Sequence, residues 1–230
     1  MTHLSINNQS LNIFPSPYIK ENMYLMLRED KALVIDPNDS EEALYLLKQN
    51  KVSEVTIFLA HEHPDHTCGV PLLQKNFETK LICQQKCAQQ IANKHSNRPI
   101  LIAFILGIQD EQNGTHTKQA FMKGFEEYEC HADIIFEEDC SYDWQGENFV
   151  FYHTPGHSQG SCCIVWNSKA VFTGDSLLKD IPVITRFPGG NTKKYNQITK
   201  PYLESLSDEM FVLPGHGKSF TIKELREKTA

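Results

Sequence analysis

The sequence lacks any long hydrophobic run, because no apolar stretch approaches the roughly 20 residues that are needed to cross a bilayer. Its first residues, MTHLSINNQSLNIF, also lack the basic segment and the apolar segment of a secretory signal. Both absences argue against insertion in a membrane and against export. We therefore expect a cytoplasmic protein with no membrane partner.

Positive charge is also scarce. The 22 Lys and Arg residues face 29 Asp and Glu residues, and the formal net charge is -7. Proteins that hold nucleic acid usually show a basic patch or stripe, and no basic run is visible in this sequence. We expect no nucleic-acid partner, and we rank a nuclease below other classes of hydrolase.

The cysteines do not form the pattern of a disulfide framework. There are seven of them, an odd number, and free thiols are the rule in a reducing cytosol. The pairs Cys83 with Cys87 and Cys162 with Cys163 suggest zinc, but a second pair at zinc-finger spacing is missing. We interpret the cysteines as packed side chains, since free cysteine is among the most buried residue types.

Short apolar segments are present, and they alternate with a helical pattern. Strands are expected at 11–14 (LNIF), 24–27 (YLML), 32–36 (ALVID) and 54–60 (EVTIFLA). Between the last two, DSEEALYLLKQN offers Asp39 or Ser40 as a helix cap, acidic residues in the first turn and one apolar face. The order strand, helix, strand favours an α/β layered fold.

The middle of the chain differs from both ends. It contains a compact apolar segment, RPILIAFILGI, and a run, KQAFMKGFEEY, that predicts one helical stripe of Phe121, Phe125 and Tyr128. Strand patterns return with NFVFYH, CCIVW, AVFTGD and EMFVLPGHG. We expect residues 1–230 to form a single domain with a mainly helical insertion at about 84–146. The apolar side chains of this insertion fit a small core, a homodimer contact or a lid.

Four polar clusters follow directly on apolar strands. EVTIFLA leads into HEHPDH, NFVFYH into TPGH, KAVFT into GD, and EMFVL into PGHG. In layered α/β folds the loops at strand ends meet at one edge, where side chains from distant parts of the sequence come together. This recurrence predicts one functional site that draws on all four clusters.

The first cluster has the residue types of a metal site. His61 and His63 stand two positions apart, so in an extended segment they project to the same side and can bind one ion. Pro64 restricts His63 to extended geometry. Asp65 and His66 follow where a helix is expected to begin, and can turn toward a second ion nearby.

The other three clusters complete these two positions. We predict His157 as a further ligand of the first ion, His216 as a ligand of the second, and Asp175 as a carboxylate that bridges both. Imidazole and carboxylate ligands without thiolate suit two divalent metal ions, with zinc as the first choice and iron or manganese as alternatives.

With these residues assembled, the chain resembles the metallo-β-lactamase superfamily and, within it, the glyoxalase II-like hydrolases. The resemblance rests on HEHPDH, HTPGHSQGS, FTGDSLL and LPGHG, and on RFPGGN downstream of Asp175. It implies a four-layer αββα sandwich of two mixed β-sheets flanked by helices, with a dinuclear metal site at one edge. The metal ligands it implies are His61, His63, Asp65, His66, His157, Asp175 and His216.

Two departures bear on the substrate. Exported lactamases of this superfamily commonly carry a cysteine where Asp175 stands, so an antibiotic lactam is not expected. Members that use glutathione thioesters have a helical region after the last ligand, whereas this sequence ends at Ala230, soon after His216. The acyl group and the leaving group of the substrate stay open.

The function that these residues favour is hydrolysis of a thioester or a related ester by a hydroxide that bridges two metal ions. Two ions about 3.5 to 4 Å apart lower the pKa of a shared water toward about 7 and polarise an acyl carbonyl. Asp65 is the predicted catalytic residue, which orients this nucleophile and accepts its proton. The expected partner is a small-molecule acyl substrate.

Two other activities fit the same residues. A lactone hydrolase would share the site and differ only in its pocket. A mononuclear iron oxidoreductase of the persulfide dioxygenase type would use the first position alone, and the retention of His66 and His216 favours the dinuclear hydrolase over it. Metal content and oxygen consumption distinguish these activities.

Overall fold

The first β-sheet is built mainly from the N-terminal half of the chain. The computed structural model describes residues 1–6, 9–97 and 100–229. Within these residues the sheet has seven strands in chain order, of which β1 to β4 are antiparallel neighbours and β4 to β7 are parallel. The strands are β1 Thr2–Ile6, β2 Gln9–Pro15, β3 Asn22–Arg28, β4 Lys31–Ile35, β5 Glu54–Phe58, β6 Glu78–Gln84 and β7 Ile134–Phe136.

The second sheet comes from the C-terminal half. In the described chain it has six strands in the order β13-β12-β11-β10-β9-β8, and only β11 and β12 run parallel to each other. The strands are β8 Cys140–Trp144, β9 Glu147–His153, β10 Cys162–Trp166, β11 Ala170–Gly174, β12 Phe211–Pro214 and β13 Phe220–Thr221. Both sheets are therefore mixed.

The alternation of side chains along each strand divides the core into three layers. In β4, Leu33 and Ile35 point between the sheets, whereas Ala32 and Val34 face the outer helices. In β10 the neighbours Cys162 and Cys163 likewise enter different cores. All seven cysteines are free, and burial raises the pKa of the Cys163 thiol to about 12.

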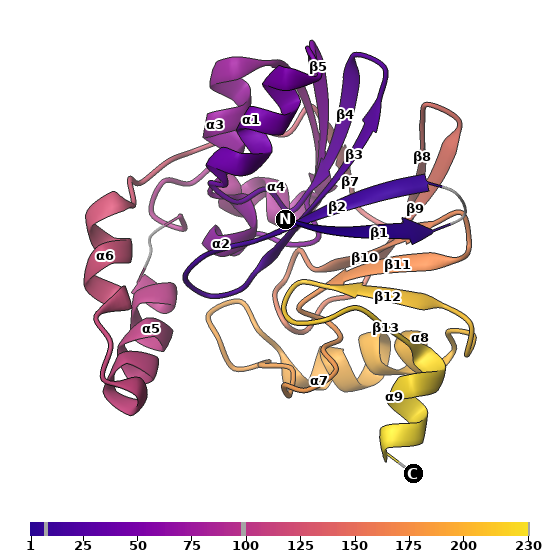
Figure 1. Ribbon diagram of the computed structural model, residues 1–230. Coiled ribbons are helices and arrows are strands. Elements are labelled where there is room, and N and C mark those ends of the chain that lie inside the picture. The colour runs from indigo at the N-terminus through magenta and orange to yellow at the C-terminus, as the bar shows by residue number, and fades with distance from the viewer. Residues whose placement is uncertain (7–8, 98–99, 230) are drawn as a thin grey trace.

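Helices cover the outer face of each sheet (Figure 1). The first sheet packs against α1 Glu41–Gln49, α3 Val70–Asn76 and α4 Gln85–Ile91. The second packs against α8 Lys200–Glu204 and α9 Ile222–Thr229, which follow the short α7 Thr192–Lys194 and the π-helical turn η1 Tyr195–Thr199. The four layers are those of the αββα sandwich that the resemblance implied, so the predicted fold class is confirmed.

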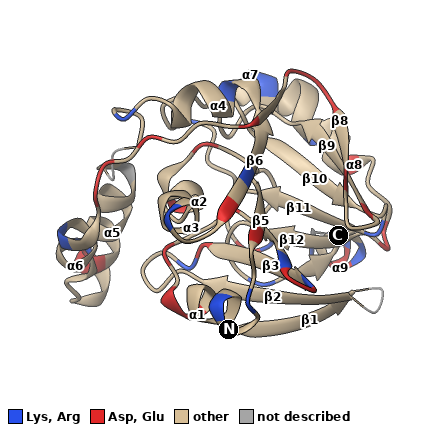
Figure 2. Cartoon of the chain, turned by 90° about the horizontal axis from the view of Figure 1, so that it is seen from above, with Lys and Arg blue, Asp and Glu red and all other residues tan. Residues whose placement is uncertain are grey.

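A helical hairpin, formed by α5 Ile100–Asn113 and α6 Thr117–Gly124, lies beside these layers (Figures 1 and 2). Asp110 near the end of α5 accepts hydrogen bonds from the backbone N–H groups of Thr117 (2.8 Å) and Lys118 (2.9 Å), and so caps α6. On α5, Leu106 is fully buried whereas Phe104 is 62% exposed.

Lys, Arg, Asp and Glu residues are spread over both sheets and the helices (Figure 2).

The expected local structure agrees with the observed elements in most places. The strands predicted from 11–14, 24–27, 32–36 and 54–60 correspond to β2, β3, β4 and β5, and Ser40 caps α1 by accepting from the N–H of Ala43 (3.2 Å). No helix in the described residues has the length and the apolarity that a membrane crossing requires.

The middle region differs from the expectation in two respects. The predicted helical stripe is wrong, because α6 ends at Gly124 and Phe125 already has extended backbone geometry, although the rings of Phe121 and Phe125 still lie 5.3 Å apart. Residues 84–146 also contain β7, an edge strand of the first sheet, and β8, an edge strand of the second, so the helical part stops at Gly124. The single-domain boundaries themselves stay a prediction.

Candidate metal centre

The four polar clusters meet at one edge of the sandwich because their strands end there. β11 and β12 are parallel, so Asp175 and His216 leave the second sheet side by side, and the N–H of Gly215 donates to Gly174 O (2.8 Å). The two sheets are joined at this edge by the N–H of Cys162, which donates to Ala60 O (2.7 Å). These bonds bring the loop after β5 against the loops of the other sheet.

The loop after β5 folds as its sequence predicts. His63 is extended, with φ -68° and ψ 144°, and Pro64 begins the short helix α2 Pro64–Thr67. Asp65 and His66 therefore lie on the first turn of α2, and the ring of His66 lies 4.1 Å from that of His61, measured between centroids. Glu62 accepts a hydrogen bond from Ser158 Oγ (2.8 Å), which ties this loop to the one that carries His157.

Three imidazole rings form the first cluster. His63 Nδ1 lies 3.1 Å from His61 Nε2 and 2.9 Å from His157 Nε2. A neutral imidazole has one N–H only, so a single proton at His63 Nδ1 cannot serve both neighbours. Nitrogen ligands of one tetrahedral zinc ion, bound at about 2.0 to 2.1 Å, are separated by about 3.3 Å, which is close to this arrangement.

The second cluster combines Asp65, His66 and His216. Asp65 Oδ2 lies 3.5 Å from His66 Nε2 and 3.3 Å from His216 Nε2. His66 is fully buried, and its Nε2 atom has no hydrogen-bond partner in the described residues. An unpaired buried nitrogen is costly unless something binds it, and a cation satisfies this requirement.

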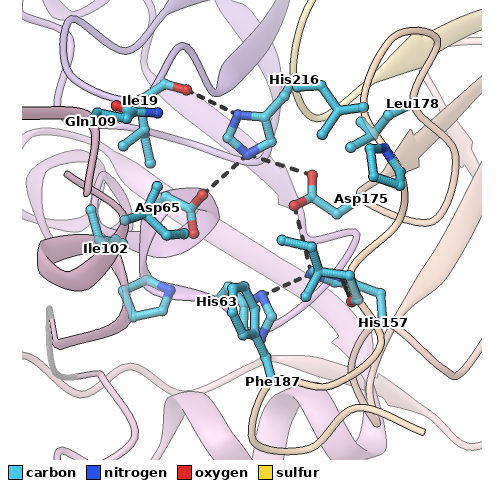
Figure 3. Close-up of a pocket in the computed structure, with 15 residues that line it drawn as sticks. Ile19, His63, Asp65, Ile102, Gln109, His157, Asp175, Leu178, Phe187 and His216 are labelled. Atoms are coloured by element: carbon cyan, nitrogen blue, oxygen red, sulfur yellow. Dashed lines mark hydrogen bonds and ion pairs between the residues drawn. The ribbon is translucent and has the colours of Figure 1, made fainter. Parts of the chain in front are cut away.

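Asp175 lies between the two clusters (Figure 3). Its Oδ1 atom is 3.5 Å from His66 Nε2 and 3.6 Å from His216 Nε2, and its Oδ2 atom is 3.6 Å from His157 Nε2. Oδ1 is buried and has no hydrogen-bond partner in the part of the chain that the structure describes. One oxygen thus faces each group of imidazoles, as expected of a bridging carboxylate.

The electrostatics of the first cluster favour metal binding. Burial and the neighbouring His157 lower the pKa of His63 to about 3, and burial together with His66 lowers the pKa of His61 well below its usual value. Both rings are therefore neutral at pH 7 and keep a lone pair for a metal. Burial alone would raise the pKa of Asp65, but His66 and His216 lower it to about 2, so this carboxylate is ionised.

Outer partners that the sequence analysis did not identify fix the rings. Asp36 Oδ2 lies 3.0 Å from His66 Nδ1, and the carbonyl oxygens of Ile184 and Ile19 lie 2.8 Å from His157 Nδ1 and 3.1 Å from His216 Nδ1. Such partners set which ring nitrogen is free for the metal. The one signal in the sequence was Asp36 at the end of the strand ALVID, whereas a backbone carbonyl leaves no mark on the residue type.

Gly215 leaves the space in which the ligands meet. A methyl group at this position would overlap Asp175 Oδ1 and would lie 2.7 Å from His66 Cε1. All seven residues predicted as ligands are thus brought together, and their spacing and the unpartnered buried atoms His66 Nε2 and Asp175 Oδ1 fit two cations. Their roles as ligands stay a prediction.

Comparisons with known proteins agree with this architecture. A probable metallo-hydrolase of Streptococcus pyogenes serotype M6 is 26% identical over 205 residues, which are 88% of this chain and 81% of that protein. The hydroxyacylglutathione hydrolase GloC of Haemophilus influenzae is 25% identical over 93% of each chain.

Two solved structures share the fold. The BLEG-1 B3 metallo-beta-lactamase has a TM-score of 0.73 at 22% identity, covering 94% of this chain and 96% of that one. TTHA1623, crystallised in a di-iron-bound form, has a TM-score of 0.72 at 24% identity, covering 95% and 98%.

A family model also matches most of the chain, the Metallo-beta-lactamase superfamily model. It spans residues 19–216 and so includes every residue of the two clusters. Its first residue, Ile19, is the one whose carbonyl oxygen contacts His216 Nδ1. Together with the sandwich fold and the His and Asp clusters of a metallo-hydrolase, this match shows that the chain belongs to the metallo-beta-lactamase superfamily.

Proposed function

We propose that this protein is a metal-dependent hydrolase of a thioester or a related ester. It binds two divalent metal ions, with zinc as the first choice of metal. The observation that carries this proposal is the position of Asp175, which directs Oδ1 toward His66 and His216 and Oδ2 toward His157. A carboxylate placed between two groups of imidazoles suits two ions better than one. The names of the hydroxyacylglutathione hydrolases among the relatives also agree with an acyl substrate.

The two clusters would hold one ion each. His61, His63 and His157 offer three lone pairs to the first, and Asp65, His66 and His216 offer ligands to the second. Divalent ions in such a site lower the pKa of a water toward about 7 and polarise the carbonyl of a substrate.

The chain's own contribution to the reaction centres on Asp65. Its Oδ2 atom lies 3.3 Å from His216 Nε2, and its pKa of about 2 keeps the carboxylate ionised at neutral pH, so that it can orient a water nucleophile by accepting a hydrogen bond from it. The outer partners, Asp36 and the carbonyl of Ile184, hold His66 and His157 in fixed orientations. No serine or cysteine is needed as a nucleophile in this scheme.

Metal analysis combined with a substrate panel tests the proposal. Purified protein with its metal content measured would be assayed on thioesters, lactones and phosphodiesters. We expect about two ions per chain and hydrolysis of a thioester or ester. Asp175→Ala should lose metal and activity together, whereas Asp208→Ala, which removes an exposed carboxylate paired with Arg226, should keep both.

Other outcomes would overturn the proposal. A single iron per chain with oxygen consumption would assign an oxidoreductase instead of a hydrolase. Turnover of lactones alone would keep the metal site and change the substrate. Full metal content in Asp175→Ala would remove the bridging role on which the two-ion scheme depends.

A further inference from the structure

A cavity of about 200 Å³ lies over the two clusters and is walled by apolar side chains. One wall is α5, which contributes Ile102 and Ile105. In Figure 3, Leu178 lies across the site from Ile102, and Phe187 lies beside His63. The ring of Phe187 also meets that of His63 edge to face, with the centroids 6.2 Å apart. The reacting end of a bound molecule would thus lie on the clusters, and its remainder would lie between these walls.

The mouth of the cavity is apolar as well. Ile181 is 51% exposed and Ile184 is 41% exposed, although both line the cavity. Exposed apolar side chains gathered around a cavity usually mark a surface that a ligand covers. Gln109 is the one polar lining residue outside the predicted metal ligands in the described chain, and it can accept or donate a hydrogen bond at the rim.

Away from the predicted metal ligands, the cavity offers, among the described residues, no positive side chain to a second, charged end of a ligand. None of its described lining residues is a Lys or an Arg. A second groove adjoins it at Ile19 and Asp65, and its titratable lining includes Asp39, Glu41, Glu126 and Glu127 against the single amine of Lys75. Burying a carboxylate without a cationic partner is strongly unfavourable. A glutathione group, which carries two carboxylates, therefore lacks a matching surface here.

We propose that the site selects substrates that are uncharged on both sides of the scissile bond and whose acyl chain is aliphatic and short. This inference rests on the proposed hydrolase function and adds the substrate class to it. The cavity lies below the roughly 300 to 1,000 Å³ of sites for drug-sized ligands, so it accommodates a chain of a few carbons. Its selectivity comes from α5 and the segment 178–187, not from the metal ligands.

Binding of simple carboxylates to the metal-loaded protein tests this inference without turnover. Calorimetry would compare acetate, butyrate and hexanoate, and would pair butyrate with succinate and hexanoate with adipate. Affinity should rise up to about fourfold for each added methylene until the cavity is full. Each monocarboxylate should bind at least tenfold more tightly than its dicarboxylate partner.

Two variants on the same helix locate the effect. Ile105→Asn changes a side chain that lines the cavity and should weaken hexanoate about tenfold while leaving acetate nearly unchanged. Ile108→Asn changes a 42% exposed side chain of α5 outside the cavity lining and should leave both affinities as they are. Equal losses in the two variants, or adipate binding as tightly as hexanoate, would overturn the inference.

The outcomes distinguish the two proposals. A preference for aliphatic chains without hydrolysis of any ester or thioester would leave the cavity assignment intact and contradict the hydrolase. Hydrolysis that is fastest for a glutathione thioester would keep the hydrolase and contradict the substrate class.

Discussion

The edge that carries the metal centre and the α5–α6 hairpin beside it are stabilised in different ways. At the edge, His61 and His66 are almost fully buried, and backbone hydrogen bonds join the loops of the two sheets. The hairpin leaves Ile100 and Phe104 70% and 62% exposed, and a side chain, Asp110, connects its helices. The comparison teaches that the predicted metal ligands are held by packed loops and backbone hydrogen bonds, whereas the hairpin, to which we assign substrate selection, depends more on side-chain contacts.

The largest effect is expected where the edge has no spare room. Gly215→Ala introduces a methyl group that overlaps Asp175 and presses on His66, so it displaces two predicted ligands at once. We expect metal affinity to fall by more than the about 10- to 100-fold that loss of an outer partner costs. Competition with a chromophoric chelator measures this.

Gly124→Ala on the hairpin is the matched control. A methyl group there meets no atom within 4 Å, and alanine suits a helix better than glycine, so metal affinity should not change. Unaltered affinity in Gly215→Ala would mean that the edge adapts as readily as the hairpin does.

A smaller effect is expected from Asp36→Asn. Asp36 has φ +51°, which asparagine tolerates, and its carboxylate accepts from Ala60 N–H (2.6 Å) while contacting His66 Nδ1. Loss of the charge should lower metal affinity about 10- to 100-fold with the fold retained. Asp133→Asn, which changes a carboxylate outside the clusters that accepts from Leu81 N–H, is the control. Identical affinities in both variants would argue against a role for Asp36 in orienting His66.

The smallest effect on the metal centre is expected from Asp110→Ala. The change removes the cap of α6, so amide hydrogen exchange in α6 should become faster while metal affinity stays the same. Partial desolvation of Asp110 opposes its charged form, but hydrogen bonds from Thr115, Thr117 and Lys118 outweigh this and lower its pKa.

The sign of the pH dependence follows from that shift. Because the pKa of Asp110 is lower in the folded state, its stabilising contribution is complete above about pH 4 and is lost as the pH falls below that value. The difference in α6 protection between the wild type and Asp110→Ala should therefore shrink from pH 5 to pH 3. A difference that is absent already at pH 7 would contradict the capping role.

The sequence was sufficient to predict which seven residues come together, because these side chains follow recognisable strands. EVTIFLA and EMFVL are apolar enough to be identified as β5 and β12, and the polar residues after them must then lie at a sheet edge. The proline at position 64 also indicated where the extended segment stops and α2 begins. The meeting of all seven residues followed from strand order.

Other features left weaker traces in the sequence. β6, ETKLICQ, was not expected because its polar residues come first and only its second half is buried. The aromatic spacing of Phe121, Phe125 and Tyr128 predicted a longer helix, but Tyr128 lies beyond the end of α6. Its hydroxyl lies 2.5 Å from Oγ1 of Thr67, the last residue of α2. Tertiary contacts of this kind override local periodicity, and residue order alone does not reveal them.

The seven clustered side chains are divided between the two halves of the chain, and this division has a thermal consequence. His63 and His157 are in contact although 94 positions separate them in sequence. Ions held jointly by these segments would cross-link the two halves of the chain reversibly, and only the folded chain brings their ligands together. Resistance to heat would then track the supply of free metal, rising with its concentration and falling when a chelator removes it.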